Sequence, residues 1–133
     1  EYEINECSLK VDAHHDGFAH LKGKPIHRRV FNYDDYKKTI RITDIIESTH
    51  LHKVNIGLLL HPLVKIIKVD NRSVIMQIRD WEIRVVSNQL DLTLKDEKWW
   101  PDLGLEHSCK QISFTCPGSK HRSDLYIHLM KQS

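Results

Sequence analysis

The sequence predicts an all-β protein, an antiparallel β-sandwich that forms a single domain over residues 1–133. In one segment after another, apolar residues recur at every second position, which is the period of a half-buried strand. Asn and Asp turns separate the segments between residues 62 and 94 at the short spacing typical of antiparallel sandwiches. No stretch has the period of an amphipathic helix, about 3.6 residues.

Each expected strand is a run of alternating residues between turn residues. The first run changes parity near Glu6, which predicts one strand with a bulge. The strongest alternation surrounds Ile56 and predicts a central strand, and Asp44 is expected at a strand end, in a structural role rather than as an acid catalyst. The expected strands are 1–11, 26–31, 39–46, 51–61, 64–69, 74–78, 81–86, 90–94, 98–104, 112–116 and 125–130.

Composition bounds the function. The chain is 40% hydrophobic and 29% charged, which is typical of a globular domain. Its net charge of +2 is too small for the strongly basic face that nucleic acid requires, and the apolar run at residues 58–60 is too short to cross a bilayer. We therefore expect neither nucleic acid nor membrane as a partner. No GxSxG elbow or phosphate-binding glycine loop occurs.

Residues 14–29, HHDGFAHLKGKPIHRR, form a polar corner between two expected strands. A turn needs only Gly, Asp or Pro for its backbone angles, so the histidines and arginines exceed that need. Arginine donates to carboxylates through a bidentate fork. His15, His27, Arg28 and Arg29 are therefore candidates for binding a substrate carboxylate. The alternative is a hydrogen-bonded corner that only fixes the turn, which we favour for Asp16 and Gly17.

His50 and His52 are weak candidates for a metal site. Their i, i+2 spacing places both imidazoles on one face of a strand. No third ligand in obvious register accompanies them, so we expect no metal and no cofactor in this chain. Cysteines number three, and CxxC spacing is absent. Cys109 and Cys116 could form a disulfide, but free thiols are favoured. The sequence does not decide the redox state of these two cysteines or of Cys7.

Trp99 and Trp100 are adjacent and cannot both face one core if they lie on a strand. An exposed indole could stack on the apolar face of a sugar, so both tryptophans are further candidates for substrate binding. They could equally cover an edge of the sandwich or an interface with another domain. The sequence leaves these alternatives open.

Three strings in this order and spacing resemble the C-terminal β-sandwich region of the heparinase II/III-like polysaccharide lyases. They are His15-Asp16-Gly17-Phe18, His27-Arg28-Arg29 and Ile42-Thr43-Asp44, and the resemblance is densest over residues 14–69, with a weaker echo at 99–114. It implies that the chain is the C-terminal part of a larger lyase-like protein, a piece of its large sandwich. The implied substrate is an acidic, uronate-containing polysaccharide such as a glycosaminoglycan or alginate, cleaved by β-elimination.

The resemblance also implies what this chain lacks. Such lyases are bacterial, periplasmic or secreted, and they pair the sandwich with an α-helical toroid, so a toroid domain of the same or another chain is an expected partner. The toroid and the family's earlier histidine-bearing strands are absent here. Catalytic residues therefore stay unassigned, a structural metal would belong to the parent protein, and the isolated chain should be inactive. A non-catalytic carbohydrate-binding or structural module is the alternative, and a protein-interaction sandwich is a third.

Overall fold

A computed structural model describes residues 1–132, apart from the side chains of residues 51–52 and 116–120. This part of the chain consists of antiparallel strands without a helix, which confirms the predicted all-β sandwich. Within it, no helix is long and apolar enough to cross a membrane. The strands are β1 (Tyr2–Ile4), β2 (Ser8–His15), β3 (Ile26–Asp34), β4 (Thr39–Leu59), β5 (Lys65–Val69), β6 (Ser73–Ile78), β7 (Trp81–Ser87), β8 (Leu92–Asp102) and β9 (Leu105–Lys131).

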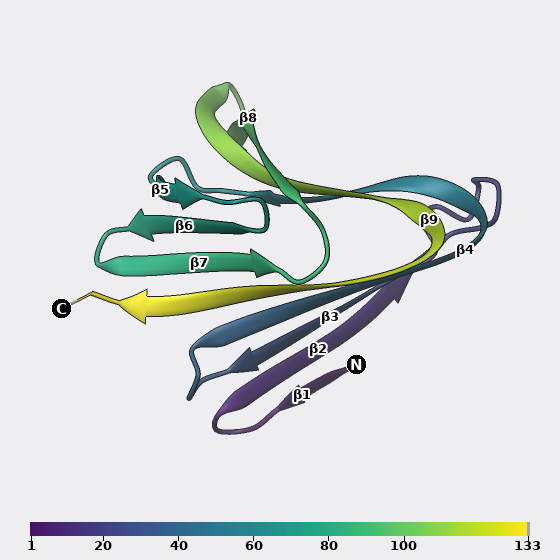
Figure 1. The fold of residues 1–133 in the computed structure, drawn as a ribbon, viewed down its shortest axis with the longest axis horizontal. Helices are drawn as coiled ribbons and strands as arrows, with labels where there is room; N and C mark the ends of the chain where they lie inside the picture. Colours follow the sequence, from purple (N-terminus) through teal and green to yellow (C-terminus); the bar gives the residue numbers. More distant parts are fainter. Residues whose placement is uncertain (133) are drawn as a thin grey trace.

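The two longest strands, β4 and β9, pair along most of their length and make the sheet fold over on itself. Both bend at one end of the molecule and run back (Figure 1). Their register shifts between Glu47 and His52, which locates the bend in β4. The first half of β4 and the second half of β9 lie in one layer, with β3, β2 and β1 on one side and β7, β6 and β5 on the other.

We call the layer that contains β1 to β3, β5 to β7, the first half of β4 and the second half of β9 the long layer. The returning halves of β4 and β9, together with β8, form the short layer. The core lies between the two layers, because alternate residues of each strand point inward. Val74 and Val85 of the long layer and Ile112 of the short layer have at most 1% of their surface exposed. Ile42, Ile56, Met76, Leu92, Phe114 and Leu125 complete the buried cluster.

Residues 1–11 form a hairpin of two strands, so the predicted single strand with a bulge is wrong. Asn5 closes the turn, because its side-chain oxygen accepts hydrogen bonds from the backbone N–H groups of Cys7 at 2.9 Å and Ser8 at 2.8 Å. The change of parity near Glu6 therefore marks a reversal of the chain. A turn and a bulge both shift the alternation of apolar and polar positions, so the sequence pattern does not distinguish them.

Three pairs of predicted strands are each continuous in the structure. The expected strands 39–46 and 51–61 fall within two residues of a single strand, β4, those at 90–94 and 98–104 within two residues of β8, and those at 112–116 and 125–130 inside β9. Between the members of a pair the alternation weakens, and the strand resumes its pairing with a shifted register between Glu47 and His52 in β4 and between Trp99 and Asp102 in β8. Asp44, expected at a strand end, therefore lies inside β4 and is 2% exposed.

Candidate functional site

The polar corner consists of the end of β2, the start of β3 and the hairpin loop between them, residues 16–25, which folds over the bend of β4. Local backbone bonds shape it, including Ala19 N–H to the Asp16 carbonyl at 2.7 Å. Gly23 has a φ of 87°, which favours glycine, and its carbonyl accepts from the backbone N–H of Thr49 at 3.1 Å. The glycine thus ties the loop to β4.

Strand register brings the candidate side chains together. His15 of β2 is opposite His27 of β3, which is opposite Ile46 of β4. In the next inward-facing row, Arg29 of β3 is opposite Asp44 of β4. Directly opposed residues of an antiparallel pair share a face, so these side chains meet on the inner face of the long layer.

Asp44 is the centre of this cluster. Its Oδ1 accepts from Arg29 Nε at 2.7 Å, and its Oδ2 accepts from Arg29 Nη2 at 3.0 Å. His27 Nε2 lies 2.6 Å from Asp44 Oδ1. The arrangement is a bidentate ion pair with an imidazole added to one oxygen, and such charge-assisted bonds are the strong ones.

When both imidazoles are neutral, the hydrogen bonds fix which ring nitrogen of each carries the proton. His27 Nε2 donates to the carboxylate, so its Nδ1 must accept from His15 Nε2, 3.2 Å away. His15 Nδ1 then accepts from the backbone N–H of Gly17, also at 3.2 Å. We call His15, His27, Arg29 and Asp44 the corner network. Its donors and acceptors alternate without conflict from the loop to the buried carboxylate.

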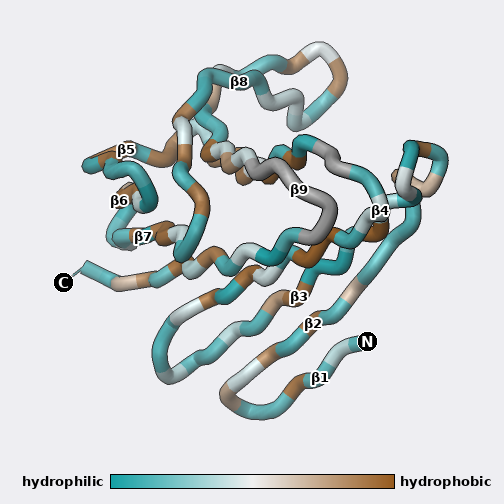
Figure 2. The backbone as a smooth tube through the Cα atoms, turned by 45° about the vertical axis from the view of Figure 1, so that its right-hand side comes forward, coloured by the Kyte–Doolittle hydropathy of each residue, from teal (hydrophilic) through white to brown (hydrophobic). Residues whose placement is uncertain are grey.

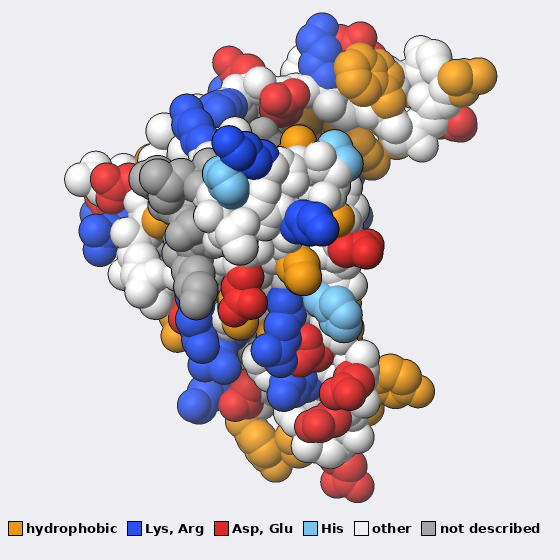
Figure 3. Space-filling view, turned by 90° about the vertical axis from the view of Figure 1, so that its right-hand side faces the viewer, with side chains coloured by type: hydrophobic (Ala, Val, Ile, Leu, Met, Phe, Trp, Pro, Cys, Tyr) orange, Lys and Arg blue, Asp and Glu red, His pale blue; other side chains and the backbone are white. Residues whose placement is uncertain are grey.

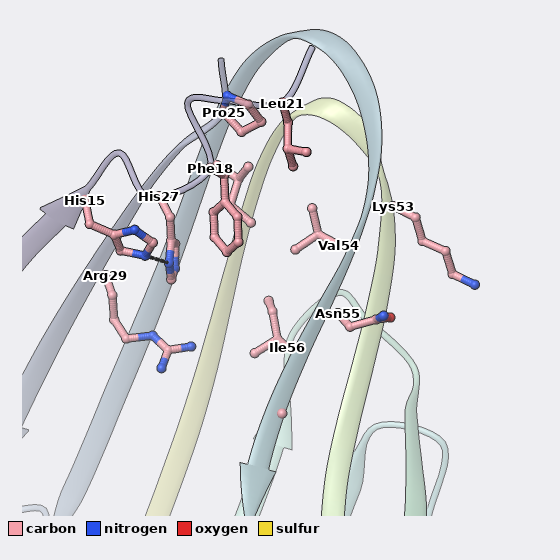
Figure 4. A pocket seen from close by; sticks show the side chains of 12 residues that line it. His15, Phe18, Leu21, Pro25, His27, Arg29, Lys53, Val54, Asn55 and Ile56 are labelled. Carbon is pink, nitrogen blue, oxygen red and sulfur yellow. Dashed lines mark hydrogen bonds between the residues drawn. The ribbon is translucent and has the colours of Figure 1, made fainter. Parts of the chain in front are cut away.

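The corner network borders a cavity of about 470 Å³ (Figure 4). Phe18, Leu21 and Pro25 cover it from the loop, and His15, His27 and Arg29 line it from the long layer. From β4, the side chains of Val54 and Ile56 point toward it, whereas those of Lys53 and Asn55 point away. The cavity therefore combines an oriented guanidinium and two imidazoles with an apolar wall.

Arg28 lies outside the corner network because neighbours in a strand point to opposite faces. It donates to Asp12 of β2 from Nε at 2.9 Å and from Nη2 at 2.5 Å, on the outer face of the long layer. That hydrogen bond lowers the pKa of the Asp12 carboxyl. Of the four candidates from the corner, the structure thus brings His15, His27 and Arg29 together and separates Arg28.

Trp99 and Trp100 lie on the β8–β9 hairpin, away from the corner (Figure 1). Trp99 packs between His61 and His107, with ring centroids 5.2 and 5.8 Å apart, whereas Trp100 is 61% exposed. The hairpin projects from the body, with hydrophobic side chains near its end (Figure 3). The two indoles therefore occupy different environments and do not share the cavity of the corner network.

No metal site is formed by the described residues. His50 is exposed, and the side chain of His52 lies outside the description. No group of three or more His, Cys, Asp or Glu among the described side chains could hold an ion. Cys7 and Cys109 are free thiols, and the side chain of Cys116 is also outside the description.

Sequence reasoning missed two residues of this region. Asp44 is expected at a strand end from the sequence, and only the β3–β4 pairing shows that its side chain lies opposite that of Arg29 on the same face. His121 of β9 is opposite Ile46, and its buried Nε2 has no hydrogen-bond partner among the described residues. Burial lowers the pKa of His121, and the charge of Asp44 opposes that effect. Nothing in the local sequence marks His121, because its position depends on a pairing with a distant strand.

In fold, the chain is similar to part of the longer chains of a heparan sulfate lyase and a heparinase III. It superposes on heparan sulfate lyase HepC from Pedobacter heparinus with a TM-score of 0.84 at 12% identity, over 98% of this chain and 21% of that one. The heparinase III BT4657 gene product gives a TM-score of 0.82 at 13% identity, over 100% of this chain and 21% of that one. The model of the heparinase II/III-like C-terminal family matches residues 3–127, and the chain belongs to that family. None of the curated proteins matches it.

Proposed function

We propose that this domain binds an acidic, uronate-containing polysaccharide through the corner network, as part of a heparinase II/III-like lyase that cleaves the polysaccharide by β-elimination. The observation that carries the proposal is Arg29, whose guanidinium is fixed by the buried Asp44 and borders the cavity. Asp44 accepts from Nε and Nη2, which leaves the Nη1 donors for a ligand carboxylate or sulfate. A guanidinium that is already oriented loses less side-chain entropy on binding.

The charges in the corner network imply a dependence on pH and salt. With neutral imidazoles, the positive charge of Arg29 is offset by Asp44, so the corner carries little net charge. Protonation of either histidine adds a positive charge beside the cavity. Binding of a uronate should therefore strengthen as pH falls and weaken as salt rises, because salt screens exposed charges over about 8 to 10 Å at physiological ionic strength.

Catalysis would require other parts of the lyase. The chain spans 21% of the length of the lyases whose fold it shares. A helical toroid, in the same or another chain, would hold the sugar against the base that removes the C5 proton. Without that placement a base loses the proximity term, worth up to roughly 7 to 11 kcal/mol. We expect the 133 residues alone to give no unsaturated product from heparin or alginate. Measurable turnover, followed by product absorbance, would contradict this division of roles.

Calorimetric titration of the chain with a uronate oligosaccharide tests the binding proposal. Arg29→Lys keeps the charge and removes the fork, so we expect binding at least tenfold weaker at pH 6. Arg28→Lys is the matched control, since Arg28 makes the same bidentate contact on the opposite face. Equal losses in both variants would show that the effect is not specific to the corner network and would count against the proposal. Unchanged binding in a folded Arg29→Lys variant would exclude the corner network as the sugar site.

A non-catalytic carbohydrate-binding module is the second candidate function, favoured by the exposure of Trp100. An exposed indole offers a flat apolar face on which a sugar ring can stack. In that case Trp100→Ala, and not Arg29→Lys, should abolish oligosaccharide binding. Neutral oligosaccharides should then bind as well as uronates, because stacking does not depend on the carboxylate.

A further inference from the structure

The outer face of the long layer points away from the core and from the corner network. Ile42 of β4 and Val85 of β7 point inward and are 5% and 1% exposed, so their neighbours Arg41 and Arg84 point outward. Hydrophobic and hydrophilic residues interleave along β1 to β3 (Figure 2), as in a sheet with one buried face and one solvated face. The outer face is therefore the polar one, and a ligand can reach it from solvent.

Two arginines of this face flank a pair of stacked rings. β9 runs between β4 and β7 in the long layer (Figure 1). Arg41 of β4 is opposite Tyr126 of β9, and Arg84 of β7 is opposite His128. The rings of Tyr126 and His128 are nearly parallel, at 9°, with centroids 6.4 Å apart. A hydrogen bond of 3.1 Å between Thr39 Oγ1 and His128 Nδ1 holds the imidazole in place. We call Arg41, Arg84, Tyr126 and His128 the outer patch.

Both arginines of the outer patch are exposed and form neither a hydrogen bond nor an ion pair with the described residues. Two other arginines of the same face, Arg28 and Arg122, each pair with an aspartate, at 2.5 and 3.6 Å. Glu82 lies two residues from Arg84 on the same face of β7 but forms no ion pair with it. The donors of Arg41 and Arg84 are thus free for a ligand, and a guanidinium can bind a carboxylate through two parallel N–H bonds.

The spacing of the two arginines selects the chemistry of the ligand. Two strand spacings of about 4.8 Å and two residue rises of about 3.4 Å place their Cα atoms roughly 12 Å apart. The rings of Tyr126 and His128 lie between them, and Val86 of β7 is opposite Tyr126. A ligand that pairs with both guanidiniums therefore carries two anionic groups and covers an apolar surface between them. A chain of acidic sugars has this chemistry, because each sugar ring has an apolar face and the carboxylates recur along the chain.

We propose that the outer patch is a second binding site for the acidic polysaccharide, on the opposite face of the long layer from the corner network. This inference rests on the proposed function, and it adds a site that holds a distant part of the same polymer. Because the patch is exposed, salt screens its charges and each ion pair contributes little. The patch acts by tethering, because a long polymer held at one site stays at high effective concentration near the other. Short oligosaccharides gain nothing from the second site.

Calorimetric titration with a long alginate chain, and with a short oligosaccharide cut from it, tests the second site. In a double variant with Arg41→Gln and Arg84→Gln, the polymer should bind about tenfold more weakly, because two ion pairs and the tether are lost. The affinity for the short oligosaccharide, which the corner network dominates, should not change. Both arginines are exposed and unpaired among the described residues, so the variant should keep its fold.

A double variant with Arg28→Gln and Arg122→Gln is the matched control. It removes the same charge from the same face, at arginines that already have aspartate partners. It should leave the affinity for the polymer unchanged, and an equal loss in both double variants would overturn the proposal. So would a loss of the same size for dextran, a neutral polymer. Single-stranded DNA that binds more tightly than alginate, and is lost in the Arg41 and Arg84 variant, would also overturn it.

NMR separates this inference from the proposed function. With the short oligosaccharide at high concentration, the Nε signals of Arg41 and Arg84 should shift in Arg29→Lys as they do in the unsubstituted chain. Shifts at Arg41 and Arg84 without any at Arg29 would refute the corner network as a sugar site and leave the outer patch standing. Shifts at Arg29 without any at Arg41 and Arg84 would overturn the outer patch and leave the proposed function standing.

Discussion

Replacing Arg29 with alanine should destabilise the fold because it leaves Asp44 buried without its ion-pair partner. The Asp44 side chain is 3% exposed, and Arg29 supplies two of its hydrogen bonds. Removing one partner of a buried pair costs about 3 to 5 kcal/mol. Arg29 is itself 30% exposed and His27 still reaches the carboxylate at 2.6 Å, so we expect a loss at the lower end, about 3 kcal/mol.

Arg28→Ala is the matched control for this prediction. It removes an arginine from the adjacent position of the same strand, with the same bidentate geometry toward Asp12. Arg28 is half exposed, and water can replace its contacts, so the free energy of unfolding should change little. Urea denaturation at pH 7, followed by tryptophan fluorescence, measures both variants. Equal destabilisation by the two substitutions would refute the argument that burial of Asp44 sets the cost.

Three further predictions concern other positions. Because burial lowers the pKa of His121 below 6.5, the unfolded chain binds more protons in acid, and the free energy of unfolding should fall as pH drops below 6.5. The fall should be smaller in His121→Gln, and identical urea curves at pH 5.5 and 7.5 would contradict this. In Gly23→Ala the new Cβ would lie 2.4 Å from Ser48 Oγ. Gly104→Ala is the control, because its φ is also positive but the space around it is open, so it should lose only about 1 kcal/mol of unfolding free energy and Gly23→Ala should lose more. Similar melting temperatures of the two variants would argue against the close contact. Ile112→Ala should lose about 2 to 5 kcal/mol because the side chain is fully buried, and a smaller loss would indicate a core that collapses around the gap.

The strands could be predicted from alternation because one face of each is buried for most of its length. β6 and β7, for example, lie within two residues of the expected ranges. The length of β4 and β9 could not be predicted from local alternation, since both strands continue beyond the bend, where the register of their pairing shifts between Glu47 and His52. The fold-over of the sheet depends on that pairing between distant segments and leaves no local signal.

The sequence predicted which residue types form the candidate site, but not how their side chains are arranged. The residue types at the corner pointed to His15, His27 and Arg29, which do lie together. Alternation alone separates Arg28 from Arg29, but which arginine faces inward follows only from the register with β4. For the same reason the carboxylate that orients the corner, Asp44, could not be recognised. Register between strands is a tertiary property, and it decided every contact in the corner network.

The most direct test of the proposed binding site is an NMR titration of the chain with a uronate oligosaccharide at pH 6. The account predicts chemical-shift changes at Arg29 Nε and at the imidazoles of His15 and His27, which border the cavity. Arg28 Nε, on the outer face, should not shift, and neither should the indole of Trp100. Shifts at Trp100 with an unchanged Arg29 would contradict the account and place the sugar on the β8–β9 hairpin.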